Sequence, residues 1–263
     1  MDDRHQRIPR FHRPGILSFF GYLLGILVLL WALSSSELSL RSSLEGLPHA
    51  WDLIKEIWPP DFTRGNAYFT AALQTFQVAV SGTFVAILIS FCLALLAAKN
   101  VTPHPLFAWG VRLSLGFIRA VPELVWAVFF VATVGIGAFA GFLAIMVDAI
   151  GFCGRFFAEA FEDADRQTQE GLIAVGCPRW LTVLAAIIPD SFPALVNTMT
   201  YTLDRAIRAS VVIGLVSAGG IGIELKVAMD MFQYQESSAL ILIIFGMVFT
   251  IEQISVWIRY KVS

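Results

Sequence analysis

Long apolar runs dominate the pattern along this chain, and charged residues, glycine or proline close each run. A helix needs roughly 20 apolar residues to cross a bilayer, and most of the runs reach or approach that length. The pattern therefore predicts an all-α integral membrane protein with about six transmembrane helices. The predicted spans are residues 16–33, 67–98, 121–134, 138–154, 192–216 and 237–258.

A polar insert at residues 155–189 separates the fourth and fifth predicted spans. Its first half is acidic, and aromatic and small residues recur there every three or four positions, which is typical of an amphipathic helix. Gly176 and Pro178 interrupt this pattern, because glycine often ends a helix and proline is tolerated mainly at the start of one. The insert therefore predicts a helix, a turn and a second helix on the membrane surface, either as a docking element or as a simple connector.

The first 66 residues differ from the rest of the chain. Four arginines (Arg4, Arg7, Arg10 and Arg13) precede the first apolar run, which is long for a signal peptide and is followed by a poor cleavage site. We expect a retained span, then a periplasmic segment with an interfacial helix near residues 51–58. Residues 67–263 form the predicted transmembrane domain.

Composition supports membrane insertion and excludes several classes of function. The chain is 57% hydrophobic and 14% charged, with a mean hydropathy of +0.73, so membrane lipid is its expected surrounding. No dense Lys/Arg patch indicates a nucleic-acid partner. Cys92, Cys153 and Cys177 are isolated in sequence, so we expect neither a disulfide framework nor a metal site.

Basic residues give the topology. Twelve of them fall on one side of the predicted spans and four on the other, as the positive-inside rule requires. We therefore expect a multi-pass protein of the cell (inner) membrane with cytoplasmic N- and C-termini and a cytoplasmic insert. The inner set is Arg4, Arg7, Arg10, Arg13, Lys99, Arg112, Arg119, Arg155, Arg166, Arg179, Arg259 and Lys261; the outer set is Arg41, Lys55, Arg64 and Lys226.

The sequence carries no phosphate-binding GxxxxGK[ST] loop, no HExxH motif and no GxSxG serine elbow. We therefore expect no enzyme activity, no catalytic residue and no cofactor in this chain. If ATP drives the protein, another chain must bind it.

Charged residues inside the predicted spans are the candidates for function, because a charge at that depth is costly and usually faces the bundle interior or a water-filled path. Asp204 and Arg208 are four apart, so they share one helical face. They form either a structural salt bridge or, with Arg205 adding positive charge, the lining of an anion pathway.

Two further carboxylates and a glycine-rich stretch also fall at membrane depth. We expect Glu123 to pair with Arg119, as a gate or as a helix-end anchor. Asp148 either reaches water near the inner face or pairs with a basic residue of the fifth span. The stretch 214–222 predicts close backbone approach or an unwound segment, or else a flexible turn; its pathway candidates are Ser217, Gly219, Gly220 and Gly222.

The insert resembles the loop of ABC-importer permeases that contacts the ATPase, written E-A-A-x3-G-x9-I-x-L-P. Glu170, Gly176 and Pro189 stand at the motif's Glu, Gly and Pro positions, while Gly171 replaces the first alanine. The resemblance implies that residues 155–189 are the coupling loop, with Glu159, Glu170, Gly171, Gly176 and Pro189 as its coupling residues.

Four segments are similar to phosphonate-importer permeases in particular. They are residues 59–62, 119–127, 134–144 and 208–222, and together the resemblance covers about residues 59–260. Methionine-type importers share part of the last segment. Asp148 and Ser217 depart from the residues that are common in the phosphonate subfamily.

The resemblance implies a type I ABC-importer permease of the methionine-importer-like architecture, which translocates phosphonate or a related phosphorus oxyanion. It also implies the partners: a second permease copy in a homodimer, two cytoplasmic ATPase subunits that bind ATP and Mg, and a periplasmic phosphonate-binding protein. A permease for another small solute such as methionine, an ion-coupled secondary transporter and a structural subunit are the alternatives. Two repeated halves, which are common in secondary transporters, are not evident.

Overall fold

The computed structural model describes residues 15–35 and 40–262, so Arg4, Arg7, Arg10 and Arg13 lie outside the described residues. Within the described residues every regular element is helical and no strand occurs, which confirms the predicted all-α class. The chain divides into two compact units, residues 1–55 and 56–263.

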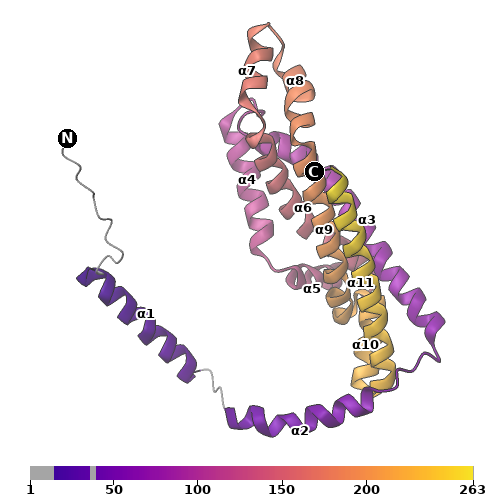
Figure 1. Ribbon diagram of the computed structural model, residues 1–263. Coiled ribbons are helices and arrows are strands. Elements are labelled where there is room, and N and C mark those ends of the chain that lie inside the picture. Colours follow the sequence, from indigo (N-terminus) through magenta and orange to yellow (C-terminus); the bar gives the residue numbers. More distant parts are fainter. Residues whose placement is uncertain (1–14, 36–39, 263) are drawn as a thin grey trace, which may run out of the picture. The chain divides into compact units, whose positions relative to one another are not determined.

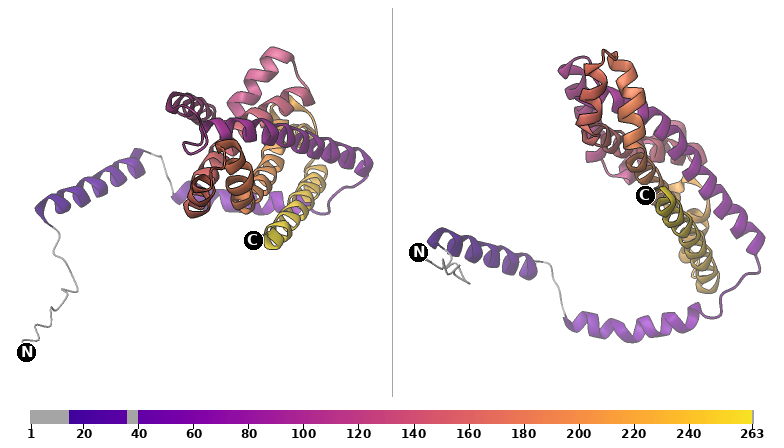
Figure 2. Two further views of the ribbon diagram at one scale, coloured as in Figure 1. Left: turned by 90° about the horizontal axis from the view of Figure 1, so that it is seen from above. Right: turned by 45° about the horizontal axis from the view of Figure 1, so that its top comes forward.

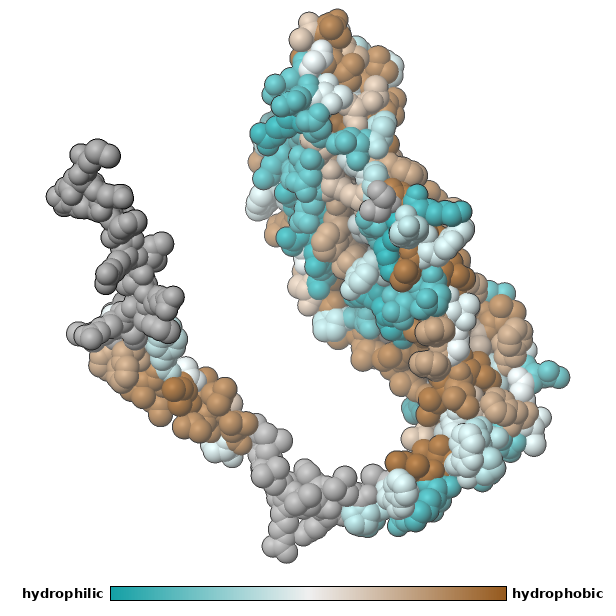
Figure 3. All heavy atoms as spheres, in the orientation of Figure 1, coloured by the Kyte–Doolittle hydropathy of each residue, from teal (hydrophilic) through white to brown (hydrophobic). Residues whose placement is uncertain are grey.

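In the first unit, α1 (Ile16–Ser35) contains a candidate membrane span. The side chains of residues 18–35 are exposed, and Figure 3 shows this helix covered by apolar side chains. The second helix, α2 (Leu40–Ile57), continues into the second unit. Trp51 and Ile54 are exposed on one face of α2 and three positions apart, which is the pattern expected of an interfacial helix.

The second unit is a helical bundle built from α3, α6, α9 and α11, with shorter helices at its two ends (Figure 1). Figure 2 shows α7 and α8 projecting together from one end of this bundle, which we call the α7–α8 end. The elements are α3 (Gly65–Ala97), α4 (Pro105–Ala120), α5 (Glu123–Val134), α6 (Ala138–Asp163), α7 (Arg166–Ala174), α8 (Arg179–Thr182), a π-helical turn (Val183–Ile187), α9 (Ile188–Ile213), a second π-helical turn (Gly214–Ala218), α10 (Ile221–Asp230) and α11 (Tyr234–Val262).

Among the described residues, five helices are long and apolar enough to cross a membrane, and the count rises to six if α4 and α5 form one broken span. This agrees with the predicted number. The predicted third span, residues 121–134, was however too short, because the apolar segment begins at Pro105 and bends by 88° between α4 and α5. Pro122 explains the bend: proline disfavours helical geometry in the residue before it and lacks the N–H that a helix interior needs.

Small residues allow α3, α4 and α6 to pack closely. A Cβ atom at Gly82 of α3 would lie 3.1 Å from Cγ2 of Ile145 in α6. One at Gly151 of α6 would lie 2.7 Å from Cγ2 of Ile118 in α4. Close backbone approach of this kind is how membrane helices gain van der Waals contact where the hydrophobic effect contributes little.

Hydrogen bonds tie the helices together at the α7–α8 end. The backbone N–H of Asp165 donates to Asp190 Oδ2 (2.7 Å), and the Ser191 hydroxyl donates to the Ala160 carbonyl (2.9 Å). The Asn100 amide donates to the Phe161 carbonyl (2.6 Å). These bonds fix the base of α7 and α8 on the bundle.

At the opposite end, the second π-helical turn and α10 touch through glycine. A Cβ atom at Gly222 would lie 2.8 Å from the backbone of Gly214 and would also overlap the Val211 carbonyl. The obstacle is backbone rather than a flexible side chain, so it cannot move aside cheaply.

We therefore expect Gly222→Ala to lower the free energy of unfolding by about 1–3 kcal/mol, as overpacking of a tight interior typically does. The matched control is Gly246→Ala, because nothing lies within 4 Å of a Cβ atom at that helical glycine. Thermal unfolding of the detergent-solubilised protein measures both. Equal midpoints for the two variants would contradict the close packing of Gly222.

Candidate functional site

Arg205 lies at the centre of a charged cluster inside the bundle. Its Nη2 atom is 3.0 Å from Asp148 Oδ1 and 3.5 Å from Glu123 Oε2, so the cluster joins α9 to α6 and α5. Its guanidinium carbon also lies 5.2 Å from the ring centre of Phe152, within range of a cation–π contact. We call Glu123, Asp148 and Arg205 the Arg205 cluster.

The cluster settles two expectations about pairing. Asp148 pairs with a basic residue of α9, which was one of its two predicted environments. Glu123 pairs with Arg205 instead of Arg119, whose guanidinium lies over the rings of Phe152 and Phe156 at 5.7 and 5.4 Å. The expected Glu123–Arg119 pair was wrong because the break at Pro122 separates two helices, so helical spacing does not hold across it.

Asp204 and Arg208 form the predicted salt bridge along α9, with Arg208 Nη2 2.7 Å from Asp204 Oδ2. The Asp204 side chain is only 10% exposed, and its Oδ1 atom has no hydrogen-bond partner among the described residues. Arg208 is 46% exposed. Because Arg205 already faces two carboxylates, the more accessible cation of this pair of arginines is Arg208.

The glycine segment adopts an irregular backbone between α9 and α10. Gly219 and Gly220 have φ angles of +86° and +75°, which only glycine adopts without strain. Ser217 lies within the π-helical turn before them, and its side chain lies outside the described part of the structure. The break predicted at the end of the fifth span is therefore present as a π-helical turn followed by two left-handed glycines.

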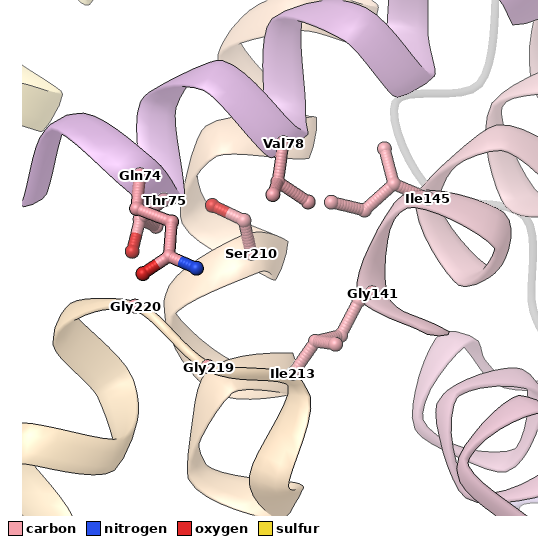
Figure 4. A pocket seen from close by; sticks show the side chains of 9 residues that line it. All are labelled: Gln74, Thr75, Val78, Gly141, Ile145, Ser210, Ile213, Gly219 and Gly220. Carbon is pink, nitrogen blue, oxygen red and sulfur yellow. The ribbon is translucent and has the colours of Figure 1, made fainter. Parts of the chain in front are cut away.

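A small cavity borders this segment, and Figure 4 shows Gln74 and Thr75 of α3 directed toward it. The Thr75 hydroxyl accepts a hydrogen bond from the Ile221 N–H (2.8 Å) at the start of α10. The cavity has a volume of about 10 Å³, which is room for roughly one water. The helices therefore leave no room for a larger solute at this position. Thr75 was not among the sequence candidates, because one threonine in a long apolar run gives no periodic signal.

A helix, a turn and a second helix are present as α7, the turn at Gly176 and α8, but they begin later than predicted. Residues 155–163, expected on the membrane surface, instead continue the bundle helix α6, and Phe157 and Phe161 are fully buried there because their aromatic face packs into the core. Glu170 and Gly171 lie exposed in α7, Gly176 has a φ of +87°, and Pro189 lies in the first turn of α9. The Gly176 and Cys177 N–H groups each donate to carbonyls of α7 at 3.0 Å, a hydrogen-bond pattern that closes a helix at a glycine. Glu159 lies in α6 and pairs with Arg155 (2.8 Å).

Apolar side chains are exposed at the tip formed by α7 and α8. Ile173, Val175 and Trp180 are exposed by 56%, 81% and 65%. They flank Gly176 and Pro178, and apolar residues beside a predicted exposed turn were the sequence signal that could have identified them. An exposed apolar patch of this kind is typical of a protein-contact surface.

A comparison with known protein families gives a match that agrees with this bundle of membrane-length helices. Residues 90–260 match the family described as binding-protein-dependent transport system inner membrane component. The chain belongs to this family. It is therefore a component of a transport system and not an enzyme, and its several apolar helices make it a multi-pass membrane protein.

Several relatives of the chain are named for phosphorus oxyanions, and others for D-methionine. The chain is 40% identical over 204 residues to the phosphate-import permease protein of Mycolicibacterium smegmatis, covering 77% of this chain and 38% of that protein. It is 38% identical over 212 residues to the phosphite transport system permease protein of Stutzerimonas stutzeri, covering 81% and 77%. The chain thus spans well under half of the mycobacterial relative and about three quarters of the other.

Solved structures show the same fold. A methionine ABC transporter in an inward-facing conformation superposes with a TM-score of 0.64 at 21% identity, covering 73% of this chain and 94% of that one. An amino acid ABC transporter with histidines also gives 0.64 at 15% identity, covering 76% and 98%. These matches show that the chain shares its helical fold with chains of those two transporters.

The start of α7 depends on an ionised carboxylate. Asp165 accepts hydrogen bonds from the Thr168 hydroxyl (2.6 Å) and from the N–H groups of Gln167 and Thr168 (both 3.1 Å), and these bonds lower its pKa below the usual value. Because this pKa is lower in the folded protein than in the unfolded one, its contribution to stability is complete above the unfolded-state pKa of about 4. The contribution is lost as the pH falls through the lower, folded-state pKa.

We expect α7 to loosen on acidification below about pH 4, where the Asp165 carboxylate begins to take up a proton. Hydrogen exchange of the Gln167 and Thr168 amides, corrected for the intrinsic pH dependence, measures this. Asp165→Asn is the matched control, because asparagine caps a helix but does not titrate. Equal pH dependence in the two proteins would contradict the role of the carboxylate.

Proposed function

We propose that this chain is the permease subunit of an ATP-driven importer that translocates phosphonate or a related phosphorus oxyanion across the cell (inner) membrane. The observation that carries the proposal is Arg208, a half-exposed guanidinium within a membrane-spanning helix. The names of the phosphate and phosphite permeases to which the chain is similar support the same substrate class.

The chemistry of Arg208 suits weak, reversible binding of an anion during its translocation. A guanidinium is always charged and presents planar donors that match two oxygens of a phosphonate. Asp204 holds one edge of Arg208 and offsets part of the cost of placing the charge at this depth. The exposed remainder is available to an anion, while the nearby carboxylate keeps the binding weak enough for release.

The projecting α7–α8 tip suits a cytoplasmic ATPase as its partner. The tip offers exposed apolar side chains and rests on α6 and α9 through the Asp165–Asp190 and Ser191–Ala160 hydrogen bonds. Two ATPase subunits bind ATP and Mg, one for each copy of the permease in a homodimer, and a periplasmic binding protein delivers the oxyanion. Both termini are cytoplasmic in this arrangement.

Coupling depends on the turn at Gly176. Nothing lies within 4 Å of a Cβ atom there, so a substitution acts through the positive φ alone and costs about 1–2 kcal/mol. We expect Gly176→Ala to lower substrate-stimulated ATP hydrolysis of the reconstituted complex by about fivefold or more, because 1 kcal/mol is a factor of about five. Membrane insertion should persist.

The matched control for coupling is Gly171→Ala. Gly171 is helical, equally open, and stands where the loop motif carries alanine, so stimulated hydrolysis should be retained. Normal stimulation in Gly176→Ala at wild-type expression would count against the coupling role of this turn.

Uptake of labelled phosphonate, phosphite and phosphate by the reconstituted complex tests the substrate class and the role of Arg208 together. Arg208→Gln alone leaves the buried Asp204 carboxylate uncompensated, which can cost several kcal/mol. The double variant Asp204→Asn/Arg208→Gln removes both charges and should therefore assemble.

We expect the double variant to lose uptake of the transported oxyanion about tenfold or more, since a hydrogen bond to a charged group contributes about 1.5–3 kcal/mol. Arg208→Lys keeps the charge without the planar fork and should be intermediate. Robust oxyanion uptake by the assembled double variant would contradict a transport role for Arg208. Asp204 and Arg208 would then form only a structural salt bridge. Uptake of methionine but of no oxyanion by the wild type would overturn the substrate class itself.

A further inference from the structure

A cavity of about 660 Å³ lies at the α7–α8 end, between the loop after α3 and the first turns of α4. The residues that line it form a polar half and an apolar half. Lys99, Thr102 and Arg112 supply the polar half, and Leu106 and Trp109 supply the apolar half. Transport as proposed above uses none of these residues.

The polar half of the cavity carries one net positive charge. Arg112 donates from Nε to the Ala97 carbonyl (2.8 Å) and pairs with Glu162, which also accepts the backbone N–H of Lys99 (2.7 Å). One carboxylate thus faces two cations. The Lys99 ammonium makes no hydrogen bond or ion pair with the part of the chain that the structure describes, and it is exposed.

The apolar half of the cavity continues along the outer face of α4. Leu106, Trp109, Leu113 and Phe117 follow one another every three or four positions, and they are exposed by 70%, 65%, 59% and 65%. An exposed apolar stripe on a helix of the membrane bundle is stabilised by hydrocarbon packed against it. Tryptophan is typical of the level where hydrocarbon meets the headgroups.

We propose that this cavity binds an anionic phospholipid, with its phosphate between Lys99, Thr102 and Arg112 and an acyl chain along the Leu106–Phe117 stripe of α4. The single negative charge of a phosphodiester matches the net charge of the polar half. Basic pockets between membrane helices on the cytoplasmic side favour such headgroups. A soluble phosphate would leave the apolar half of the cavity and the stripe uncovered, so the lipid is the occupant that fits the whole site.

Native mass spectrometry of the intact permease, with added phosphatidylglycerol or phosphatidylcholine, tests the proposal. We expect the wild type to retain phosphatidylglycerol in preference to phosphatidylcholine. The double variant Lys99→Gln/Thr102→Val removes the free ammonium and the hydroxyl, and it should lower affinity for phosphatidylglycerol about tenfold or more, as expected for losing bonds to a charged group. Lys99→Arg should keep the preference.

Lys261→Gln is the matched control, because it also removes one lysine charge but at a place outside the cavity. The Lys261 ammonium lies 4.1 Å from the ring centre of Trp257, an exposed tryptophan. This variant should leave phosphatidylglycerol affinity unchanged. Equal losses in Lys261→Gln and the double variant would show attraction to surface charge in general and overturn the site. So would the absence of any preference in the wild type, or displacement of the lipid by millimolar inorganic phosphate. These readouts do not involve uptake, so they stand apart from the transport proposal.

Discussion

The need to compensate charge inside an apolar bundle is the constraint on which this structure depends. Arg205 satisfies it by meeting Glu123 and Asp148, and in doing so it fixes α5 against α6 and α9. The bend at Pro122 separates α5 from α4, so this cluster and the apolar contacts of α5 hold the short helix in place. Removing Arg205 would leave both carboxylates without their cation at a depth where an uncompensated charge is expensive.

The two ends of the bundle are held by different means. At the α7–α8 end, hydrogen bonds join the start of α9 to α6 and to Asp165, the residue that caps α7. At the other end, Gly214 and Gly222 bring backbones together, and Thr75 caps α10 across the bundle. Hydrogen bonds thus hold the α7–α8 end, while glycine permits close backbone packing at the other end.

Arg205 and Arg208 show how the same residue type takes two roles within one helix. They are three residues apart in α9, yet they pair with different carboxylates. Arg205 is shared by two carboxylates and supports the architecture, whereas Arg208 has a single partner and remains half exposed. The electropositive contribution expected from Arg205 is therefore offset within its own cluster, and the accessible charge is that of Arg208.

The sequence by itself determined the features that depend on local pattern. Apolar run length predicted the helices, the spacing of Asp204 and Arg208 predicted their salt bridge, and Gly176 predicted the turn between α7 and α8. Each follows from backbone geometry within a few residues. Tertiary structure alone decided the partners of Glu123 and Asp148 and the capping of α10 by Thr75. These contacts join helices distant in sequence, so their register depends on packing and on the bend at Pro122, which helical periodicity does not encode.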